Sequence, residues 1–320
     1  MKRFKNILVV HDEGKNGQAT LARAVELAGT NQARLTLMHV IDQLPDEYRM
    51  LITSLLPDEI MDMAIQEQVA RLEAYAGSFS VPITVRVVAG REFLEIIRQV
   101  LRESHDLVIK TARGMSGVMG MLFGSTAMHL LRKCPCPVWL IKPGSRGRFA
   151  RIMAAVDVVP AEVGEDELNI KILELASSLA RQGQSELHIV HAWQQPDGIL
   201  ASGRLDYFAG DAEKLLNESE NMHVRWLDDL LASFDLKDIR HHDQVVRGWP
   251  DEAIPAYARE KDIDLIVMGT VCRTGIPGFF IGNTAEKILH RVDCSVLAVK
   301  PDGFQTPVTL EEPAAPQVQG

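Results

Sequence analysis

One stretch of this sequence places glycine and hydroxyl residues at a spacing that suits the binding of a phosphate. It begins with Thr111 and Gly114 and continues, after nine further residues, with Gly124, Ser125 and Thr126. A strand-like run precedes the stretch and a helix-like run follows it, so loop and helix N–H groups would point at one place. Glycine also lets the backbone approach a phosphate closely and adopt positive φ. We therefore predict an anion cradle, against the alternative of a flexible connection that its glycines merely turn.

A second version of this stretch lies near the other end of the chain. Gly269 and Cys272 are followed, after nine residues, by Gly282, Asn283 and Thr284. The recurrence at the same spacing favours a functional cradle over chance. Neither copy contains the Gly-Lys-Ser/Thr sequence of a P-loop, so neither places a lysine for the β- and γ-phosphates.

Two aspartates are candidates for contacting a ribose or an adenine amine beside these cradles. Asp12 and Asp157 each end the first apolar run of their half of the chain. In an open parallel sheet, ligands bind beyond the carboxyl ends of the strands, where both carboxylates are expected. Helix capping is the alternative role for them. Arg113 and Arg273 could balance the charge of a phosphate, although a solvated surface position is the simpler interpretation of both.

The cysteine and histidine pairs elsewhere in the chain do not predict a site. Cys134 and Cys136 flank a single proline with no further ligand nearby, so we expect them to mark the entry to a strand. His241 and His242 lack a third ligand at a suitable spacing and are expected on the surface of an edge strand. We predict no metal cofactor. Because no motif positions a nucleophile beside a base, we also expect no enzymatic activity.

Five apolar runs, with helix-like segments between them, predict the elements that position the first cradle. The runs lie at residues 6–12, 35–41, 82–88, 107–111 and 137–141. Strands that alternate with helices form a parallel sheet joined by right-handed crossovers. The expected fold class is therefore α/β, with a doubly wound, Rossmann-like parallel sheet.

The order of elements then begins again, which indicates an internal duplication. Val88, Asp106 and Cys136 each have a counterpart 158 residues later, within a matching local sequence. A constant offset over so many residues is difficult to obtain by chance. We predict two tandem domains of this fold class, at 1–145 and 146–303, followed by a disordered tail at 304–320.

Two groups of apolar residues are expected to make contacts beyond a single domain. The methionines of residues 50–63 and 114–123 suit a core or a subunit interface, including that of a homodimer, or else a pocket for an acyl chain. Pseudo-symmetric packing of the two domains through their fifth strands would cover edge strands that otherwise stay exposed. The residues expected in that packing are Val138, Leu140, Val296 and Ala298.

Composition restricts the kinds of partner that the chain can bind. Its 320 residues include 43 acidic and 34 basic side chains, and the formal net charge of −9 argues against direct nucleic-acid binding. No apolar run reaches the roughly 18 residues of a membrane span. The four cysteines form no secreted disulfide framework. We expect a protein of the cytoplasm, with no membrane partner.

The two cradles resemble those of the universal stress protein family, whose nucleotide-binding members carry Gly, two residues, Gly, nine residues and Gly-Ser/Thr after a fourth strand. The likeness covers both halves, as in tandem members of that family, and residues 129–135, 282–286 and 304–308 carry a narrower likeness to the E type. The resemblance implies a five-stranded, doubly wound domain in each half. It also implies a cytoplasmic stress-response protein that binds ATP or AMP.

Each cradle departs from the family pattern. Thr111 replaces the first glycine in the first half, whereas Cys272 and Asn283 replace a glycine and a hydroxyl residue in the second. We rank the first cradle modestly above the second, because Ser125 and Thr126 retain its hydroxyls. The leading hypothesis is a stress-response protein that binds an adenine nucleotide with little or no hydrolysis. The alternative is a sensor or carrier whose degenerate cradles have given way to a site for an apolar, phosphate-containing ligand.

Overall fold

Strands and helices alternate along the whole chain, as the apolar runs predicted. The computed structural model describes residues 4–42, 57–112, 114–117, 120–144, 148–160, 165–194, 209–270 and 281–310. The first half contains β1 (Asn6–Val10), α1 (Gly14–Asn31), β2 (Arg34–Ile41), α3 (Pro57–Ala76), β3 (Ile83–Ala89), α4 (Glu92–Glu103), β4 (Leu107–Thr111), β5 (Gly114–Gly117), β6 (Gly120–Phe123), α5 (Ser125–Lys133) and β7 (Val138–Ile141). The second half contains β8 (Arg151–Val156), α6 (Glu165–Gly183), β9 (Glu186–Trp193), α8 (Ala209–Leu231), β10 (His241–Arg247), α9 (Pro250–Glu260), β11 (Leu265–Gly269), α10 (Asn283–Arg291) and β12 (Ser295–Val299).

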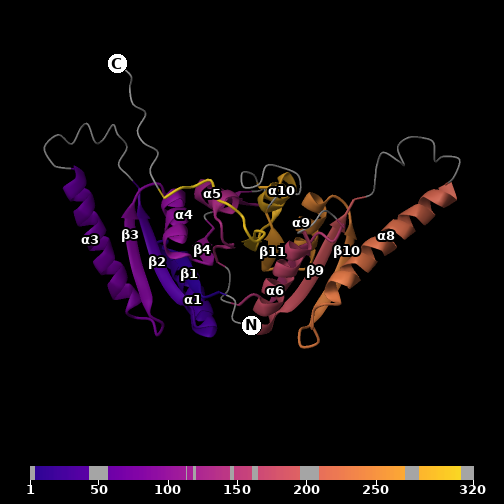
Figure 1. Cartoon of the computed structure of the whole chain (residues 1–320), viewed down its shortest axis with the longest axis horizontal. Coiled ribbons are helices and arrows are strands. Elements are labelled where there is room, and N and C mark those ends of the chain that lie inside the picture. The colour runs from indigo at the N-terminus through magenta and orange to yellow at the C-terminus, as the bar shows by residue number, and fades with distance from the viewer. Residues whose placement is uncertain are drawn as a thin grey trace, which may run out of the picture.

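A single ten-stranded sheet runs through both halves, in the order β10-β9-β8-β11-β12-β7-β4-β1-β2-β3. Neighbouring strands within each half are parallel, and each half has the strand order of a doubly wound domain. Figure 1 shows the two halves side by side, with α3 and α8 at the two outer ends. The predicted fold class, two tandem doubly wound α/β domains, is confirmed.

The two halves join through their fifth strands, as predicted. Strands β7 and β12 pair antiparallel, with Val296 opposite Leu140 and Ala298 opposite Val138. All four side chains are at most 2% exposed. Each strand would otherwise be an unpaired apolar edge, so the pairing satisfies backbone groups and buries side chains in one step. The predicted domain boundary, between residues 145 and 146, lies outside the described residues.

Two apolar cores lie on opposite faces of the sheet, and each extends through both halves. Helices α1, α3, α6 and α8 cover the face that contains Ile7, Trp139 and Leu297. Helices α4, α5, α9 and α10 cover the other face, which contains Leu8 and Val296. Successive residues of a buried strand point to opposite faces, which explains the near-continuous apolar runs in the sequence.

Residues 114–123 are not the plain loop that the glycines predicted. Strands β5 and β6 form an antiparallel hairpin, with Gly114 opposite Phe123 and Gly117 opposite Gly120. The predicted first cradle therefore contains a two-stranded element between the end of β4 and the start of α5. Strand β6 also lies against α10, so this hairpin of the first half reaches the second half.

The chain after β12 returns to the first half. Phe304 lies under the ammonium of Lys300, with Nζ 4.1 Å from the ring centroid. Val308 is buried, and Arg98 of α4 donates a hydrogen bond of 3.3 Å to the carbonyl oxygen of Thr309. Residues 304–310 of the predicted tail therefore include contacts with the first half, and residues 311–320 lie outside the described part of the chain.

Candidate ligand-binding sites at the carboxyl ends of the strands

The sheet brings each predicted aspartate to the level of its own cradle. Val9 of β1 pairs with Ile109 of β4, and Ala155 of β8 pairs with Met268 of β11. Continuing each register places Asp12 level with Ala112 and Asp157 level with Thr270. Helix capping explains neither aspartate, because the N-cap of α1 is Glu13 and α6 begins only at Glu165. Both carboxylates therefore lie where ligands bind in an open parallel sheet.

In the first half, a buried lysine that the sequence analysis did not single out holds the aspartate. Lys110 of β4 has a side chain only 3% exposed, and its Nζ lies 2.6 Å from Glu92 Oε1 and 3.5 Å from Asp12 Oδ2. Asp12 is itself 6% exposed. The counterpart of Lys110 in the second half is Met268, at the offset of 158 residues. A lysine inside an apolar strand run was the available signal, since a buried ammonium needs anionic partners.

Thr111, the residue that replaces the first motif glycine, packs against a helix. Its Oγ1 lies 2.9 Å from Oγ1 of Thr20 in α1, and both residues are buried. The counterpart is Gly269, where an added Cβ would lie 2.9 Å from Leu168 Cδ2 of α6. The residue type at this position is therefore set at least in part by packing against the first helix of its own half, α1 or α6. The hydroxyl of Thr111 is already bonded to Thr20.

The cradle helices begin where the sequence predicted, but their glycines are not in a left-handed conformation. Gly124 and Gly282 are the N-caps of α5 and α10, and φ is −61° at both. The expectation of positive φ is therefore wrong for these two positions. Neither helix has a side-chain hydrogen bond capping its first turn, which leaves backbone N–H groups for an anion. Ser125, Asn283 and Thr284 are exposed, and Thr126 is half-buried.

The second half presents a more open aspartate and a buried hydroxyl. The side chain of Asp157 is 55% exposed. Its backbone is fixed by Asn169 of α6, which accepts from Asp157 N at 3.1 Å and donates to Asp157 O at 2.8 Å. Thr270 is 1% exposed, and its Oγ1 has no hydrogen-bond partner among the residues that the structure describes. Gly282 N donates to Thr270 O at 3.0 Å, so the residue after β11 and the N-cap of α10 lie next to each other.

An aromatic and histidine cluster lies beside Asp157. His191 Nε2 of β9 is 2.9 Å from His223 Nδ1 of α8, and His191 Nδ1 is 3.9 Å from Asp157 Oδ1. The His223 ring stacks on Trp193 with ring centroids 5.0 Å apart. Burial lowers the pKa of His223, and the neighbouring His191 lowers it further. The cluster therefore places stacked rings, with His223 neutral at pH 7, next to the exposed carboxylate.

The first half has an open pocket that the sequence did not predict. Its volume is about 370 Å³, and it extends from the end of β1 across the start of α1 to α3. Arg71 of α3 pairs with Glu13 across it at 2.7 Å. Burial lowers the pKa of His11, which lines the pocket, and of the adjacent His39, so both are neutral at pH 7. The lining residues are His11, Asp12, Glu13, Gly14, Gln18, Arg71, Leu72 and Tyr75.

The cysteine pair lies where the sequence predicted, whereas Met63 does not lie in a core. Cys134 and Cys136 are buried with Sγ atoms 3.6 Å apart, immediately before β7, as expected for a strand entry. Met63, expected in a core or interface, is 70% exposed on α3 within this chain. Arg113, Cys272 and Arg273, together with residues 50–56 of the methionine-rich segment, lie outside the described side chains. No helix in the described ranges is long and apolar enough to cross a membrane.

Comparison with known proteins gives matches along the whole chain. A model of the universal stress protein family matches residues 3–142 and again residues 148–300. Universal stress protein E of Escherichia coli strain K12 is 32% identical over an alignment of 320 residues, which covers 98% of this chain and 99% of that protein. A homolog of universal stress protein E from Haemophilus influenzae is 28% identical, with coverage of 93% and 98%.

Solved structures show the same two-domain arrangement. A functionally unknown protein from Pseudomonas aeruginosa PAO1 superposes with a TM-score of 0.69 at 25% identity, covering 95% of both chains. A universal stress protein from Archaeoglobus fulgidus superposes with a TM-score of 0.58 at 20% identity, covering 92% of this chain and 98% of that one. These matches support the fold and its duplication over nearly the full length.

Proposed function

Because the chain belongs to the universal stress protein family, as a tandem member similar to the E type, we propose that it binds an adenine nucleotide, ATP or AMP, at the cradle of its second half. The proposal includes a cytoplasmic role in the stress response, with little or no enzymatic activity. It continues the expectation that the resemblance raised, and it assigns the ligand to one half of the chain.

The observation that carries the proposal is the unpaired hydroxyl of Thr270 beside the start of α10. A buried hydroxyl without a hydrogen-bond partner costs about 1–3 kcal/mol, so its presence needs a compensating role. Thr270 lies next to Gly282, the N-cap of a helix whose first N–H groups have no side-chain cap. A phosphate at this place would accept from those N–H groups and from the hydroxyl. Asp157, level with Thr270, is exposed enough to accept hydrogen bonds from a ribose or adenine.

The first half lacks the equivalent of both features. Ala112 stands where the second half has Thr270, and Lys110 holds Asp12 in a buried ion pair. A base or ribose that used Asp12 would have to compete with a desolvated ammonium, which is costly. The hairpin β5–β6 also begins at Gly114, directly after β4. On these grounds we propose the second cradle ahead of the first, the opposite of the order expected from the sequence.

Binding rather than catalysis is proposed because the two described histidines beside Asp157 are not placed to act on a phosphate. His191 and His223 are hydrogen-bonded to one another on β9 and α8, whereas a phosphate would lie at the start of α10. Hydrolysis would need a base that positions a water in line with the phosphate. The proposed role is therefore a response to nucleotide through the protein's conformation or contacts.

A second candidate function is favoured by the pocket of the first half. Leu72 and Tyr75 offer apolar surface there, and Arg71 offers a positive charge. Helix α3 also exposes Met63. An amphiphilic ligand with a phosphate would suit this combination, since a guanidinium pairs well with phosphate and aromatic rings pack against apolar chains. This candidate is the sensor or carrier that the sequence analysis gave as the alternative.

Mass spectrometry of protein purified at low salt, without a heating or acid step, tests the two functions. The proposal expects ATP or AMP to co-purify with wild-type protein and to be lost from a Gly282→Val variant, but not from a matched Gly124→Val variant. Recovery of a lipid-like mass that disappears on Arg71→Ala would favour the second candidate. Recovery of neither ligand, with no ATP binding on titration, would contradict both.

A further inference from the structure

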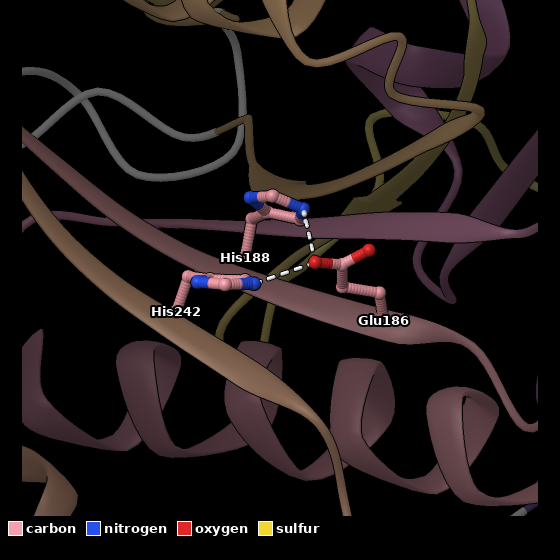
Figure 2. A group of neighbouring side chains, drawn as sticks. All are labelled: Glu186, His188 and His242. Carbon is pink, nitrogen blue, oxygen red and sulfur yellow. Dashed lines mark hydrogen bonds and ion pairs between the residues drawn. The ribbon is translucent and has the colours of Figure 1, made fainter.

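Three potential metal ligands meet at the amino ends of two neighbouring strands in the second half. Glu186 and His188 are two residues apart on β9 and therefore point to the same face of the sheet. His242 of the edge strand β10 lies directly opposite His188 in the register. Figure 2 shows the Glu186 carboxylate directed at both imidazole rings. The cluster lies at the opposite ends of the strands from the candidate nucleotide site.

The donor atoms are already close to the arrangement that a bound ion requires. One ligand atom of each residue lies within 4.8 Å of the other two. Glu186 Oε1 is 2.5 Å from His242 Nε2 and 3.9 Å from His188 Nε2. Two donors bound to the same tetrahedral zinc lie about 3.3 Å apart, given metal–ligand distances of about 2.0–2.1 Å. Movements of less than about 1 Å in side chains would therefore complete a three-ligand site.

His188 carries the strongest indication of a ligand. The residue is 4% exposed, and its Nε2 has no hydrogen-bond partner within the described part of the chain. Its Nδ1 lies 3.0 Å from the hydroxyl of Tyr257 on α9. When Nδ1–H donates to that hydroxyl, the Nε2 lone pair is left free for a ligand, 3.9 Å from Glu186 Oε1. Metal-binding histidines are oriented in this way by a partner on the second ring nitrogen.

Solvent access suits a cation, and the nearer of the two competing arginines is free to move. The side chain of His242 is 42% exposed, which gives an ion and its water ligands a route from solvent. Arg240 Nε lies 3.5 Å from Glu186 Oε1, and Arg151 Nε lies 3.8 Å from Glu186 Oε2. Arg240 is 78% exposed, so it can move away when a cation takes its place beside the carboxylate. Arg151 would continue to hold the second carboxylate oxygen.

We propose that Glu186, His188 and His242 bind a divalent transition-metal ion, with zinc as the first choice. Two imidazoles and one carboxylate suit zinc, whereas magnesium and calcium prefer all-oxygen ligands. Three protein ligands leave a position for water or for a group from a partner. Because His242 lies on the edge strand and the other two ligands on β9, the ion would fasten the outer strand of the sheet. The site is independent of nucleotide at the opposite strand ends.

The test uses untagged, full-length protein freed of metal by EDTA and dialysis, then titrated with zinc and, separately, with cobalt(II). We expect one zinc per chain with a Kd in the micromolar range or below, and a visible absorption band for the cobalt form. His188→Gln, His242→Gln and Glu186→Gln should each weaken zinc binding at least about 100-fold. Tyr257→Phe should weaken it about 10- to 100-fold, the usual effect of losing an orienting partner.

His241→Gln is the matched control, because His241 precedes His242 on β10 and its Nδ1 bonds to Ile239 O at 2.9 Å. It should leave the zinc affinity unchanged. Circular dichroism in EDTA checks that each variant folds, and the two more exposed ligands, Glu186 and His242, give variants that test the site even if His188→Gln does not fold. Zinc binding that survives Glu186→Gln and His242→Gln, or that falls equally with His241→Gln, would overturn the proposal. Absence of binding to wild-type protein at 100 µM zinc would do the same.

Discussion

Replacing Lys110 by methionine, the residue at the equivalent position of the second half, should destabilise the protein markedly. The substitution removes the ammonium that lies 2.6 Å from Glu92 and 3.5 Å from Asp12 while keeping the volume of the side chain. Asp12 and Glu92, whose side chains are 6% and 22% exposed, would then be two neighbouring carboxylates without that cation. The network, and not the hydrophobic volume, is therefore what the experiment perturbs.

The magnitude follows from the burial of the three groups. Removing one member of a buried ion pair costs about 3–5 kcal/mol, because the remaining charge stays desolvated. Glu92 is partly exposed and can recover some hydration, so we expect about 3 kcal/mol for Lys110→Met. The triple variant Asp12→Asn, Glu92→Gln, Lys110→Met removes both carboxylate charges as well, and it should return to within about 1 kcal/mol of the wild type.

Urea unfolding followed by far-UV circular dichroism measures these differences. Lys142→Met is the matched control, because Lys142 Nζ is 3.0 Å from Asp293 in a pair whose side chains are 35% and 66% exposed. Such an exposed pair contributes at most about 1 kcal/mol. The reasoning fails if Lys110→Met costs no more than Lys142→Met, or if the triple variant is no more stable than Lys110→Met alone.

Further expectations concern the strand pairing, acid stability and the buried hydroxyl. The double substitution Val138→Asp, Val296→Asp places charges at side chains at most 1% exposed and should raise hydrogen exchange throughout β7 and β12; unchanged exchange would mean that these strands do not hold the halves together. Burial lowers the pKa of six histidines from 6.5 in the folded protein, so the unfolded chain binds protons at a higher pH than the folded chain does. The free energy of unfolding should therefore fall as the pH decreases below about 6.5. A urea midpoint that is constant from pH 7.5 to 5.5 would be inconsistent with this. Thr270→Val should weaken ATP binding about tenfold. It should also raise the stability of the ligand-free protein by about 1 kcal/mol, because it removes an unpaired buried hydroxyl. Equal ATP affinity in the wild type and in Thr270→Val would show that Thr270 is not part of the site. The histidines in the second expectation are His11, His39, His105, His129, His188 and His223.

The fold could be predicted from the sequence because its signals repeat. Apolar runs such as 107–111 recur after a constant offset, and buried parallel strands need little more than such runs. The pairing of β7 with β12 followed from the need to cover an edge. The hairpin of residues 114–123 could not be predicted, because glycines that alternate with large apolar residues suit a loop and a short hairpin equally well.

The site residues were harder to predict, because their roles depend on neighbours that are distant in the sequence. Thr111 was interpreted only as a departure from the motif glycine, but its hydroxyl bonds to Thr20, 91 residues away. His242 was expected to lack a third ligand because Glu186 lies 56 residues earlier, on the adjacent strand. Lys110 is a single charged residue at the end of an apolar run, and such a residue gives no signal in the sequence that it pairs with Asp12 and Glu92. In each case, the register of the sheet supplies the information that spacing along the chain does not contain.

Titration calorimetry with ATP on three proteins tests the central claim, that the second half carries the nucleotide site. Wild-type protein and Gly124→Val should each bind one ATP with affinities that agree within about threefold. Gly282→Val should bind at least about tenfold more weakly, because a side chain would occupy the space beside Thr270 and the first N–H groups of α10. Loss of binding in Gly124→Val with full binding in Gly282→Val would place the site in the first half and contradict the account, as would the absence of ATP binding to the wild type.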